Sequence, residues 1–238
     1  MGWTAVPIGA GTVASVSEVI RSYHARRGRL SPNQRLALAE HADLDLANWP
    51  DPLDLDAVFK RRAPRVLEIG SGLGDTALHL ASTRPDTDFI AADVHTKGIA
   101  RTLLQIEQRQ LTNLRVLHED ALDFLTRRLP AQSLQQLLVY FPDPWPKARH
   151  HKRRLVRRDF AVAAARALVP GGELHLATDI AEYALVMREV LDRQPGMRKT
   201  YDGPRQPDRP RTKYESAGER QGRHAIDLVY VRRAPSTL

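Results

Sequence analysis

The chain has 238 residues, 42% of them hydrophobic, which is enough for one α/β domain with a substantial core and too few for two full domains. Its formal charge of +8 at pH 7 favours a polyanionic partner over an acidic protein or a small neutral substrate. The lack of cysteine excludes disulfides, thiolate metal sites and cysteine nucleophiles, and no window reaches the roughly 18 to 20 apolar residues of a membrane span, so we expect a soluble cytoplasmic protein.

Residues 1–62 are predicted to form a tail followed by a helical cap. The mildly apolar start is broken by proline and glycine and lacks a basic leader, which argues against a targeting segment. Residues 16–59 look like two or three short helices, and Ser31 fits an N-cap ahead of Pro32 at a first helical position. We expect a cap on a domain over residues 63–238, not a separate domain.

From Arg65 onward, short β-type runs alternate with helical patterns, which predicts a parallel sheet with crossover helices. The predicted strands are RVLEI, DFIAAD, LRVLHE, LQQLLVYF, ELHLAT and, last, AIDLVYVRR. The predicted helices cover residues 76–82, 97–110, 122–128, 155–168 and 181–192. Residues 202–223 are rich in proline, glycine and arginine without an apolar period, and they are predicted to form a long functional loop.

A glycine-rich turn follows the first predicted strand in RVLEIGSGLGDTALHLA. A turn between a buried strand and a helix offers backbone N–H groups and close backbone approach to a ligand. Gly70, Gly72 and Gly74 form G-x-G-x-G, whereas a dinucleotide fingerprint has its third glycine where this chain has Asp75. This spacing disfavours a nicotinamide cofactor and leaves a structural turn as the alternative to a cofactor loop.

Acidic residues stand at three successive strand ends. Asp93 ends DFIAAD about 20 residues past the glycine turn, where an acid can accept hydrogen bonds from ribose hydroxyls. Glu119 and Asp120 follow LRVL, although Asp120 also fits a helix N-cap. With Glu68, these acids suit a nucleoside that carries a cationic group, and they repel a pyrophosphate. S-adenosylmethionine fits that description, and the chain resembles the class I methyltransferases, which have a Rossmann-like α/β fold with a mostly parallel sheet, helices on both faces and an antiparallel C-terminal strand.

The strand LQQLLVYF leads into FPDPWP, which places Asp143 at the same sheet edge. Pro142 and Pro144 restrict the backbone on both sides, and a proline-flanked turn is the structural alternative to a catalytic loop. The basic arm that follows comprises Lys147, Arg149, Lys152, Arg153, Arg154, Arg157 and Arg158, with His150 and His151 among them. It contains no acid and is predicted to hold phosphates around a target nucleotide without reading sequence. Trp145 is expected either to stack on an RNA base or to pack on the core.

The segment FPDPWPKARHHKRRL resembles the signature of the bacterial tRNA (guanine-N7-)-methyltransferases, which methylate a guanine in the tRNA variable loop. The segments RRGRLSPNQ, ATDIAEYA and TKYESAGERQGRHAIDLVY also resemble that family, in order and with matching spacing over residues 21–233. Three departures stand out: Asp93 replaces a usual glutamate, Gln221-Gly222-Arg223 replaces a common L-G-H, and Ile226 replaces a frequent tryptophan.

The resemblance implies S-adenosyl-L-methionine as cofactor, tRNA position 46 as target, no metal, and a monomer or homodimer. It implies cofactor contacts from Glu68, Gly70, Asp93, Asp120 and Asp143, and a catalytic role for Asp143. It implies tRNA or guanine contacts from Lys147, Asp179, Thr212, Lys213, Tyr214 and Glu215. The corresponding RNA-binding region comprises Arg149, His150, His151, Lys152, Arg153 and Arg154.

The implied reaction needs no strong base, because guanine N7 already carries a lone pair in the ring plane. A carboxylate at Asp143 would stabilise the positive charge that moves to the purine more in the transition state than in the ground state. We expect Asp179 and Glu215 to accept hydrogen bonds from the guanine N1–H and exocyclic amine, and the loop over residues 207–221 to close over the base.

Three alternatives remain at this point. Some enzymes that methylate exocyclic base amines carry D-P-P-[FY], but here Trp145 precedes Pro146 and Lys147 follows it. A non-catalytic RNA-binding module would have lost acids that this chain keeps. A nicotinamide oxidoreductase is disfavoured by the glycine spacing and by the acids at the strand ends.

Overall fold

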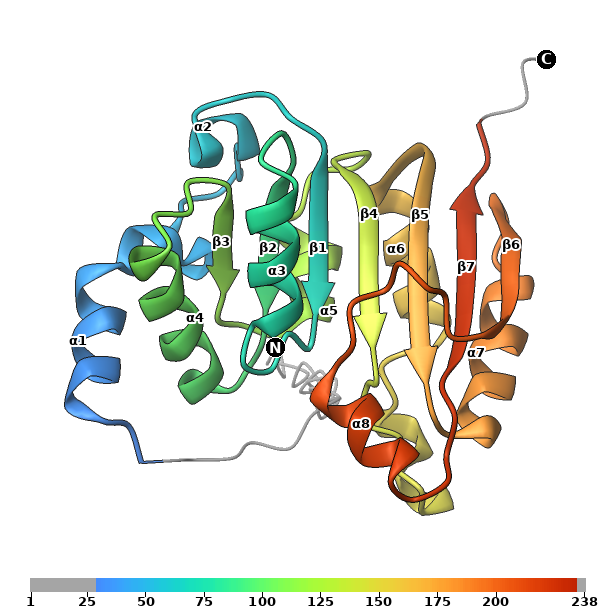
Figure 1. The fold of residues 1–238 in the computed structure, drawn as a ribbon. Coiled ribbons are helices and arrows are strands. Elements are labelled where there is room, and N and C mark those ends of the chain that lie inside the picture. The colour runs from blue at the N-terminus through green and yellow to red at the C-terminus, as the bar shows by residue number, and fades with distance from the viewer. Residues whose placement is uncertain (1–28, 235–238) are drawn as a thin grey trace, which may run out of the picture.

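The structure, a computed structural model, describes residues 29–234. Its sheet has seven strands in the order β3-β2-β1-β4-β5-β7-β6 (Figure 1). The strands are β1 (Arg65–Ile69), β2 (Asp88–Ala92), β3 (Leu114–Leu117), β4 (Leu134–Tyr140), β5 (Leu168–Thr178), β6 (Met197–Pro204) and β7 (Ile226–Arg232). β1 to β5 pair in parallel, and β7 is antiparallel to both β5 and β6. The strand order reverses between β1 and β4, which is where ligands bind in open α/β sheets.

Helices cover both faces of the sheet, as predicted (Figure 1). One face carries α1 (Pro32–Glu40), α3 (Asp75–Thr83) and α4 (Thr96–Gln108), and the other carries α5 (Ala121–Asp123), α6 (Arg158–Ala167) and α7 (Ala181–Asp192). The remaining helices are α2 (Leu55–Phe59), α8 (Lys213–Glu219) and the short turns η1 (Ala42–Leu44), η2 (Leu46–Asn48), η3 (Phe124–Arg128) and η4 (Ala148–Arg153). α8 lies at the carboxyl edge of the parallel strands (Figure 1).

Alternation along the strands divides the apolar core into two layers. In β1, Val66 joins the layer under α3 and α4, whereas Leu67 joins the layer under α6 and α7. Successive side chains of a strand point to opposite faces, so Glu68 shares the face of Val66. The Glu68 side chain therefore points toward the layer under α3 and α4.

The first described helix, α1, has the N-cap that the sequence predicts. Ser31 accepts a hydrogen bond from the Gln34 backbone at 3.2 Å, and the Gln34 side chain accepts one from Ser31 N at 3.0 Å, which forms a capping box. Asp45 forms a parallel β-bridge with Val116 of the outer strand β3, so the segment before β1 packs along that side of the sheet. The predicted tail, the start of the predicted cap and most of RRGR lie outside the described residues.

The prediction of one long loop over residues 202–223 was wrong. This segment contains the end of β6 and all of α8. β6 is an edge strand whose side chains are largely exposed, so its main support is the ladder to β7, which local hydrophobicity does not reveal. The signal for α8 was present, because Thr212 caps it by accepting a hydrogen bond from Glu215 N at 3.1 Å, as T-x-x-E predicts.

Candidate active site

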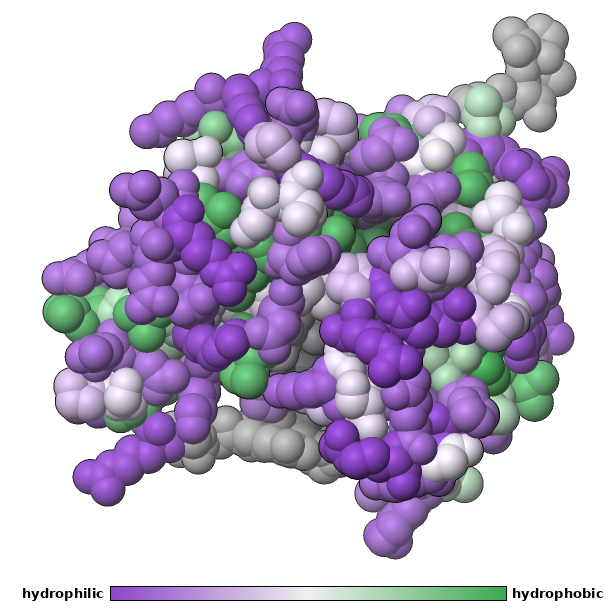
Figure 2. All heavy atoms as spheres, in the orientation of Figure 1, coloured by the Kyte–Doolittle hydropathy of each residue, from purple (hydrophilic) through white to green (hydrophobic). Residues whose placement is uncertain are grey.

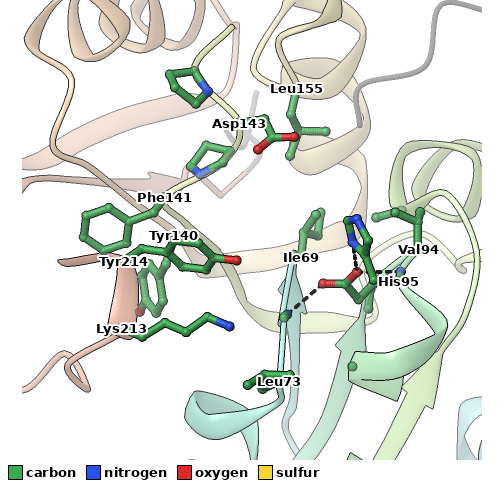
Figure 3. Close-up of a pocket in the computed structure, with 18 of the residues that line it drawn as sticks. Ile69, Leu73, Val94, His95, Tyr140, Phe141, Asp143, Leu155, Lys213 and Tyr214 are labelled. Atoms are coloured by element: carbon green, nitrogen blue, oxygen red, sulfur yellow. Dashed lines mark hydrogen bonds and ion pairs between the residues drawn. The ribbon is translucent and has the colours of Figure 1, made fainter. Parts of the chain in front are cut away.

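A cavity of about 610 Å³ opens at the carboxyl edge of the sheet, within the size range of small-ligand sites (Figure 3). It lies between the glycine turn, the ends of β2, β3 and β4, and α8. Its walls mix apolar side chains with the acids Asp93, Glu119, Asp120, Asp143 and Asp179. The sheet topology therefore brings the predicted strand-end acids together.

The glycine turn is tied to the end of β2. Gly72 N donates to Asp93 Oδ2 at 2.7 Å, while Asp93 Oδ1 accepts from His95 N at 2.7 Å (Figure 3). Gly70 and Gly72 have φ values of 76° and 60°, which favour glycine. A Cβ on Gly98 would lie 1.9 Å from Gly72 O, so the turn crosses the start of α4 in backbone contact. The structure thus uses these glycines for close approach and positive φ.

Two acids at the end of β3 line the cavity in different ways. Asp120 caps α5 by accepting from Leu122 N at 2.8 Å, so it fulfils its capping role while lining the cavity. Glu119 accepts from Arg128 at 3.0 Å. Burial raises the pKa of Glu119, and the charge and hydrogen bond of Arg128 partly oppose this rise. This corner therefore carries a carboxylate balanced by a guanidinium.

Glu68 lies beneath the glycine turn and does not line the cavity. Strand alternation turns its side chain toward the start of α3, where Thr76 and the Ala77 backbone donate hydrogen bonds to it. Complete burial raises the pKa of Glu68 to about 7, although those hydrogen bonds lower it. Within the described residues, no hydrogen bond reaches its buried Oε2.

The loop after β4 holds Asp143 in a strained backbone. Phe141 and Trp145 have φ values of 51° and 43°, in a region where a non-glycine residue costs about 1–3 kcal/mol. Pro142 and Pro144 lie between them, and the exposed Asp143 lines the cavity (Figure 3). Trp145 is only 4% exposed, so its ring packs on the protein and is not a free stacking surface for RNA.

The basic arm has an inner and an outer part. Arg154 is buried, and its guanidinium donates to both Glu182 oxygens at 2.9 and 2.6 Å and to Pro144 O at 2.8 Å. The Arg153 guanidinium lies 4.9 Å from the centre of the Trp145 ring. His150 and His151 are half-buried, and the exposed cations of the arm are Lys147, Arg149, Lys152 and Arg158. Arg154 therefore anchors the loop after β4, and the outer cations face solvent.

The wall formed by α8 contributes Lys213 and Tyr214 (Figure 3). The Lys213 ammonium lies 5.0 Å from the centre of the Tyr214 ring. In the same cavity, Asp179 Oδ2 accepts a hydrogen bond from Arg223 Nε at 2.7 Å. A Cβ on Gly218 would lie 2.4 Å from that same oxygen, so α8 packs directly against Asp179.

Beneath α8 lies a buried ionic network. Arg209 donates to both oxygens of Glu215 at 3.0 and 2.8 Å and to Asp227 at 2.8 Å. Burial would raise the pKa of Asp227, but hydrogen bonds from His175 and Arg209 outweigh it and lower that pKa. The Arg209 guanidinium also lies 5.3 Å from the centre of the Phe141 ring. The network ties α8 to the sheet and to the loop after β4.

The cavity gathers only part of the predicted site. The predicted residues that line it are Gly70, Asp93, Asp120, Asp143, Asp179, Lys213 and Tyr214. Those outside its lining are Glu68, Lys147, Thr212, Glu215, Arg149, His150, His151, Lys152, Arg153 and Arg154. Their functional roles stay predictions. The cavity also contains residues that sequence reasoning did not assign to the site, among them His95, Lys97, Tyr140 and Arg223. In the sequence, Arg223 stood out only as part of the Gln221-Gly222-Arg223 departure from the family's common L-G-H.

Figure 2 shows a strongly hydrophilic surface over the segment between β6 and α8. In the part of the chain that the structure describes, no helix has the length and apolar character needed to cross a membrane. Nor does any cluster of three or more His, Asp or Glu side chains suited to a metal ion form among residues 29–234.

The fold and the acid-lined cavity define a Rossmann-like class I methyltransferase. A family model described as "Putative methyltransferase" matches residues 62–228. Among solved structures, the antibiotic-resistance methyltransferase Kmr superposes with a TM-score of 0.57 at 18% identity, covering 79% of this chain and 95% of that chain. At this identity, the likeness establishes the fold.

Sequence relatives specify the family within that class. A tRNA (guanine-N(7)-)-methyltransferase of Alkalilimnicola ehrlichii is 45% identical, over 90% of this chain and 93% of the relative. The protein of the same name from Nitrosospira multiformis is 44% identical, over 89% of this chain and 93% of the relative. The chain belongs to the tRNA (guanine-N7-)-methyltransferase family.

Proposed function

We propose that this protein transfers a methyl group from S-adenosyl-L-methionine to N7 of the guanine at position 46 of tRNA. The observation that carries the proposal is the exposed Asp143, which lines a methyltransferase cavity beside a cationic arm in a chain of this family. Because the proposed substrate is tRNA, we propose that the reaction takes place in the cytoplasm. We also propose that residues 1–62, an N-terminal tail and a helical cap, precede a catalytic domain over residues 63–238.

The lining residues fit the proposed cofactor. S-adenosylmethionine, when bound, supplies a methyl group activated by a sulfonium. The residues that would hold it are Gly70, Asp93, Asp120 and Asp143, which combine a glycine position without a Cβ atom with carboxylate acceptors. Carboxylates suit the cationic end and the ribose hydroxyls, and they disfavour a pyrophosphate. Glu68 supports the turn from below through α3.

Asp143 acts on the charge of the purine. Guanine N7 is already a nucleophile, so the protein needs no general base. As positive charge develops on the purine, the Asp143 carboxylate stabilises it, and the flanking backbone orients that carboxylate before the reaction begins. Arg154 contributes indirectly, because its bond to Pro144 O fixes one side of the loop. Positioning and electrostatics therefore provide most of the acceleration.

We assign recognition of the guanine edge to Asp179, which lines the cavity and is half-buried. A carboxylate accepts hydrogen bonds from both N1–H and the exocyclic amine of guanine, whereas adenine offers an acceptor at N1. Glu215 was predicted to share this task, but its carboxylate is held by Arg209 and Arg205. In our proposal Glu215 holds α8, which carries Lys213 and Tyr214 to the cavity.

The direct test is to incubate the purified protein with unmodified tRNA and S-adenosylmethionine, digest the RNA, and identify the methylated nucleosides by mass spectrometry. We expect 7-methylguanosine, located at position 46 by mapping of nuclease fragments. A tRNA with adenosine at that position serves as the matched control and should remain unmethylated. Methylation of an exocyclic base amine, or none at all, would contradict the proposal.

A further inference from the structure

Arg223 reaches into the cavity and binds the acid to which we assign base recognition. Its Nε donates to Asp179 Oδ2 at 2.7 Å. The Asp179 side chain is 14% exposed and the Arg223 side chain 39% exposed, so the pair lies at the mouth of the cavity, where a base could enter. Both residues line the same cavity as Asp143. The ion pair is therefore part of the site and not a remote surface contact.

The end of α8 is shaped to deliver Arg223 to this position. Gly222 has a φ of 72°, and its N–H donates to Glu219 O at 2.9 Å. Arg223 N donates to Gly218 O at 3.0 Å, which completes a Schellman motif. Since Gly218 has no side chain, α8 approaches Asp179 closely enough for the chain to turn back onto it. Backbone conformation and close packing thus hold the guanidinium beside the carboxylate.

We propose that Arg223 is a positioning residue for guanine recognition, and this inference rests on the proposed function. A guanidinium donates hydrogen bonds and never accepts them, so the Asp179 oxygen that faces Arg223 is held as an acceptor. Each carboxylate oxygen can accept about two hydrogen bonds, so Arg223 Nε leaves acceptor positions for the base. Among the described residues, no hydrogen bond reaches Asp179 Oδ1. Arg223 thus presents Asp179 as an acceptor that matches guanine N1–H and N2–H and opposes adenine N1.

A competing role for Arg223 is a contact to a tRNA phosphate. A phosphate contact would strengthen binding of every tRNA equally and would add about 0.7 to the slope of log affinity against log salt. A positioning role would leave that slope unchanged and would alter only the discrimination between bases. Base discrimination and salt dependence therefore separate the two roles.

The test uses two tRNA transcripts that carry either guanosine or inosine at the target position, since inosine keeps N1–H and lacks the exocyclic amine. For the wild-type protein we expect kcat/KM to fall about 10- to 100-fold on inosine, the range for a lost hydrogen bond to a charged group. In Arg223→Gln we expect a lower kcat/KM on guanosine and an inosine effect below about threefold. Arg223→Lys, which keeps a charged donor, should restore part of the effect.

Binding of both tRNAs without S-adenosylmethionine, measured by fluorescence anisotropy, provides a second readout. We expect the salt slope of Arg223→Gln to equal that of the wild type. Arg220→Gln removes an exposed arginine at the end of the same helix and should leave the inosine effect unchanged. Thermal melting of each variant identifies a general loss of folding.

An inosine effect in Arg223→Gln equal to that of the wild type overturns the inference while leaving the proposed function in place. A reduced salt slope with an unchanged inosine effect also overturns it and assigns Arg223 to phosphate binding. If the wild-type protein forms no 7-methylguanosine on the guanosine tRNA, the proposed function fails, and the inference fails with it. The wild-type product and the comparison of variants therefore report on separate claims.

Discussion

Asp143 stands in a backbone that leaves its side chain little choice of position. Two prolines flank it, and two residues with positive φ enclose the turn. We expect Asp143→Asn to lower kcat about 10²- to 10³-fold, because the amide keeps the shape but loses the charge that stabilises the methylated purine. Single-turnover methylation of tRNA measures the effect, with Asp86→Asn, an exposed acid in the turn before β2, as control. An Asp143→Asn protein as fast as the wild type would remove Asp143 from the mechanism.

Glu68 makes a different prediction, because its side chain is sealed under α3. Its pKa is raised from 4.5 to about 7, so the folded protein holds a proton that the unfolded chain releases between these values. Its contribution to the free energy of unfolding is present in full below pH 4.5 and is lost as the pH rises through 7, by up to about 3 kcal/mol. The free energy of unfolding of Glu68→Gln should not fall in this way, because its side chain stays neutral.

Urea unfolding of the ligand-free protein at pH 5 and pH 8 measures the difference. Glu189→Gln, an exposed glutamate paired with Arg193, should follow the wild type at both values of pH. If wild type and Glu68→Gln lose the same free energy of unfolding over this range, the buried proton is absent.

At the scale of elements, α8 depends on the ionic network below it. Arg209→Met leaves Glu215 and Asp227 as buried carboxylates without their shared guanidinium, and we expect a loss of about 3–5 kcal/mol in the free energy of unfolding. Arg211→Met removes an exposed guanidinium paired with Glu219 and should cost less than about 1 kcal/mol. Urea unfolding compares the two variants, and equal losses would show that apolar packing holds α8.

At the scale of the whole molecule, the charge of +8 predicts binding to tRNA that depends strongly on salt. We expect tRNA affinity to fall steeply between about 50 and 200 mM salt, because phosphate contacts release counterions. Changing the outer arm residues Arg149 and Lys152 to glutamine should reduce the slope of log affinity against log salt by about 1.4 to 1.8.

The matched control is a double variant that loses the same amount of positive charge at positions outside the arm. Lys60 follows α2 and Arg198 lies in edge strand β6, both away from the cavity lining. Changing this pair to glutamine should leave the slope close to that of the wild type. Equal slopes for the two double variants would assign tRNA binding to net charge and not to the arm.

The sequence by itself determined six of the seven strands, the glycine turn and the acids at the strand ends, whereas the edge strand β6 was not predicted. β1 was predicted residue for residue as RVLEI, because a short run of mainly apolar and β-branched side chains is a local signal. Asp93, Asp120 and Asp143 could be grouped from strand positions alone, because the carboxyl ends of parallel strands share one edge. The motif FPDPWPKARHHKRRL supplied the family and, with it, the reaction.

Only the tertiary structure decided which polar residues face the cavity. Arg154 and Glu182 are 28 residues apart, and Arg209 and Asp227 are 18 residues apart, so no local sequence pattern predicts these pairs. The bond to Glu182 holds Arg154 in the interior, and Arg209 does the same for Glu215. Asp179 and Arg223 instead pair at the cavity. A charged side chain takes the environment that satisfies it at the lowest cost of desolvation, and that environment exists only once distant segments have packed together.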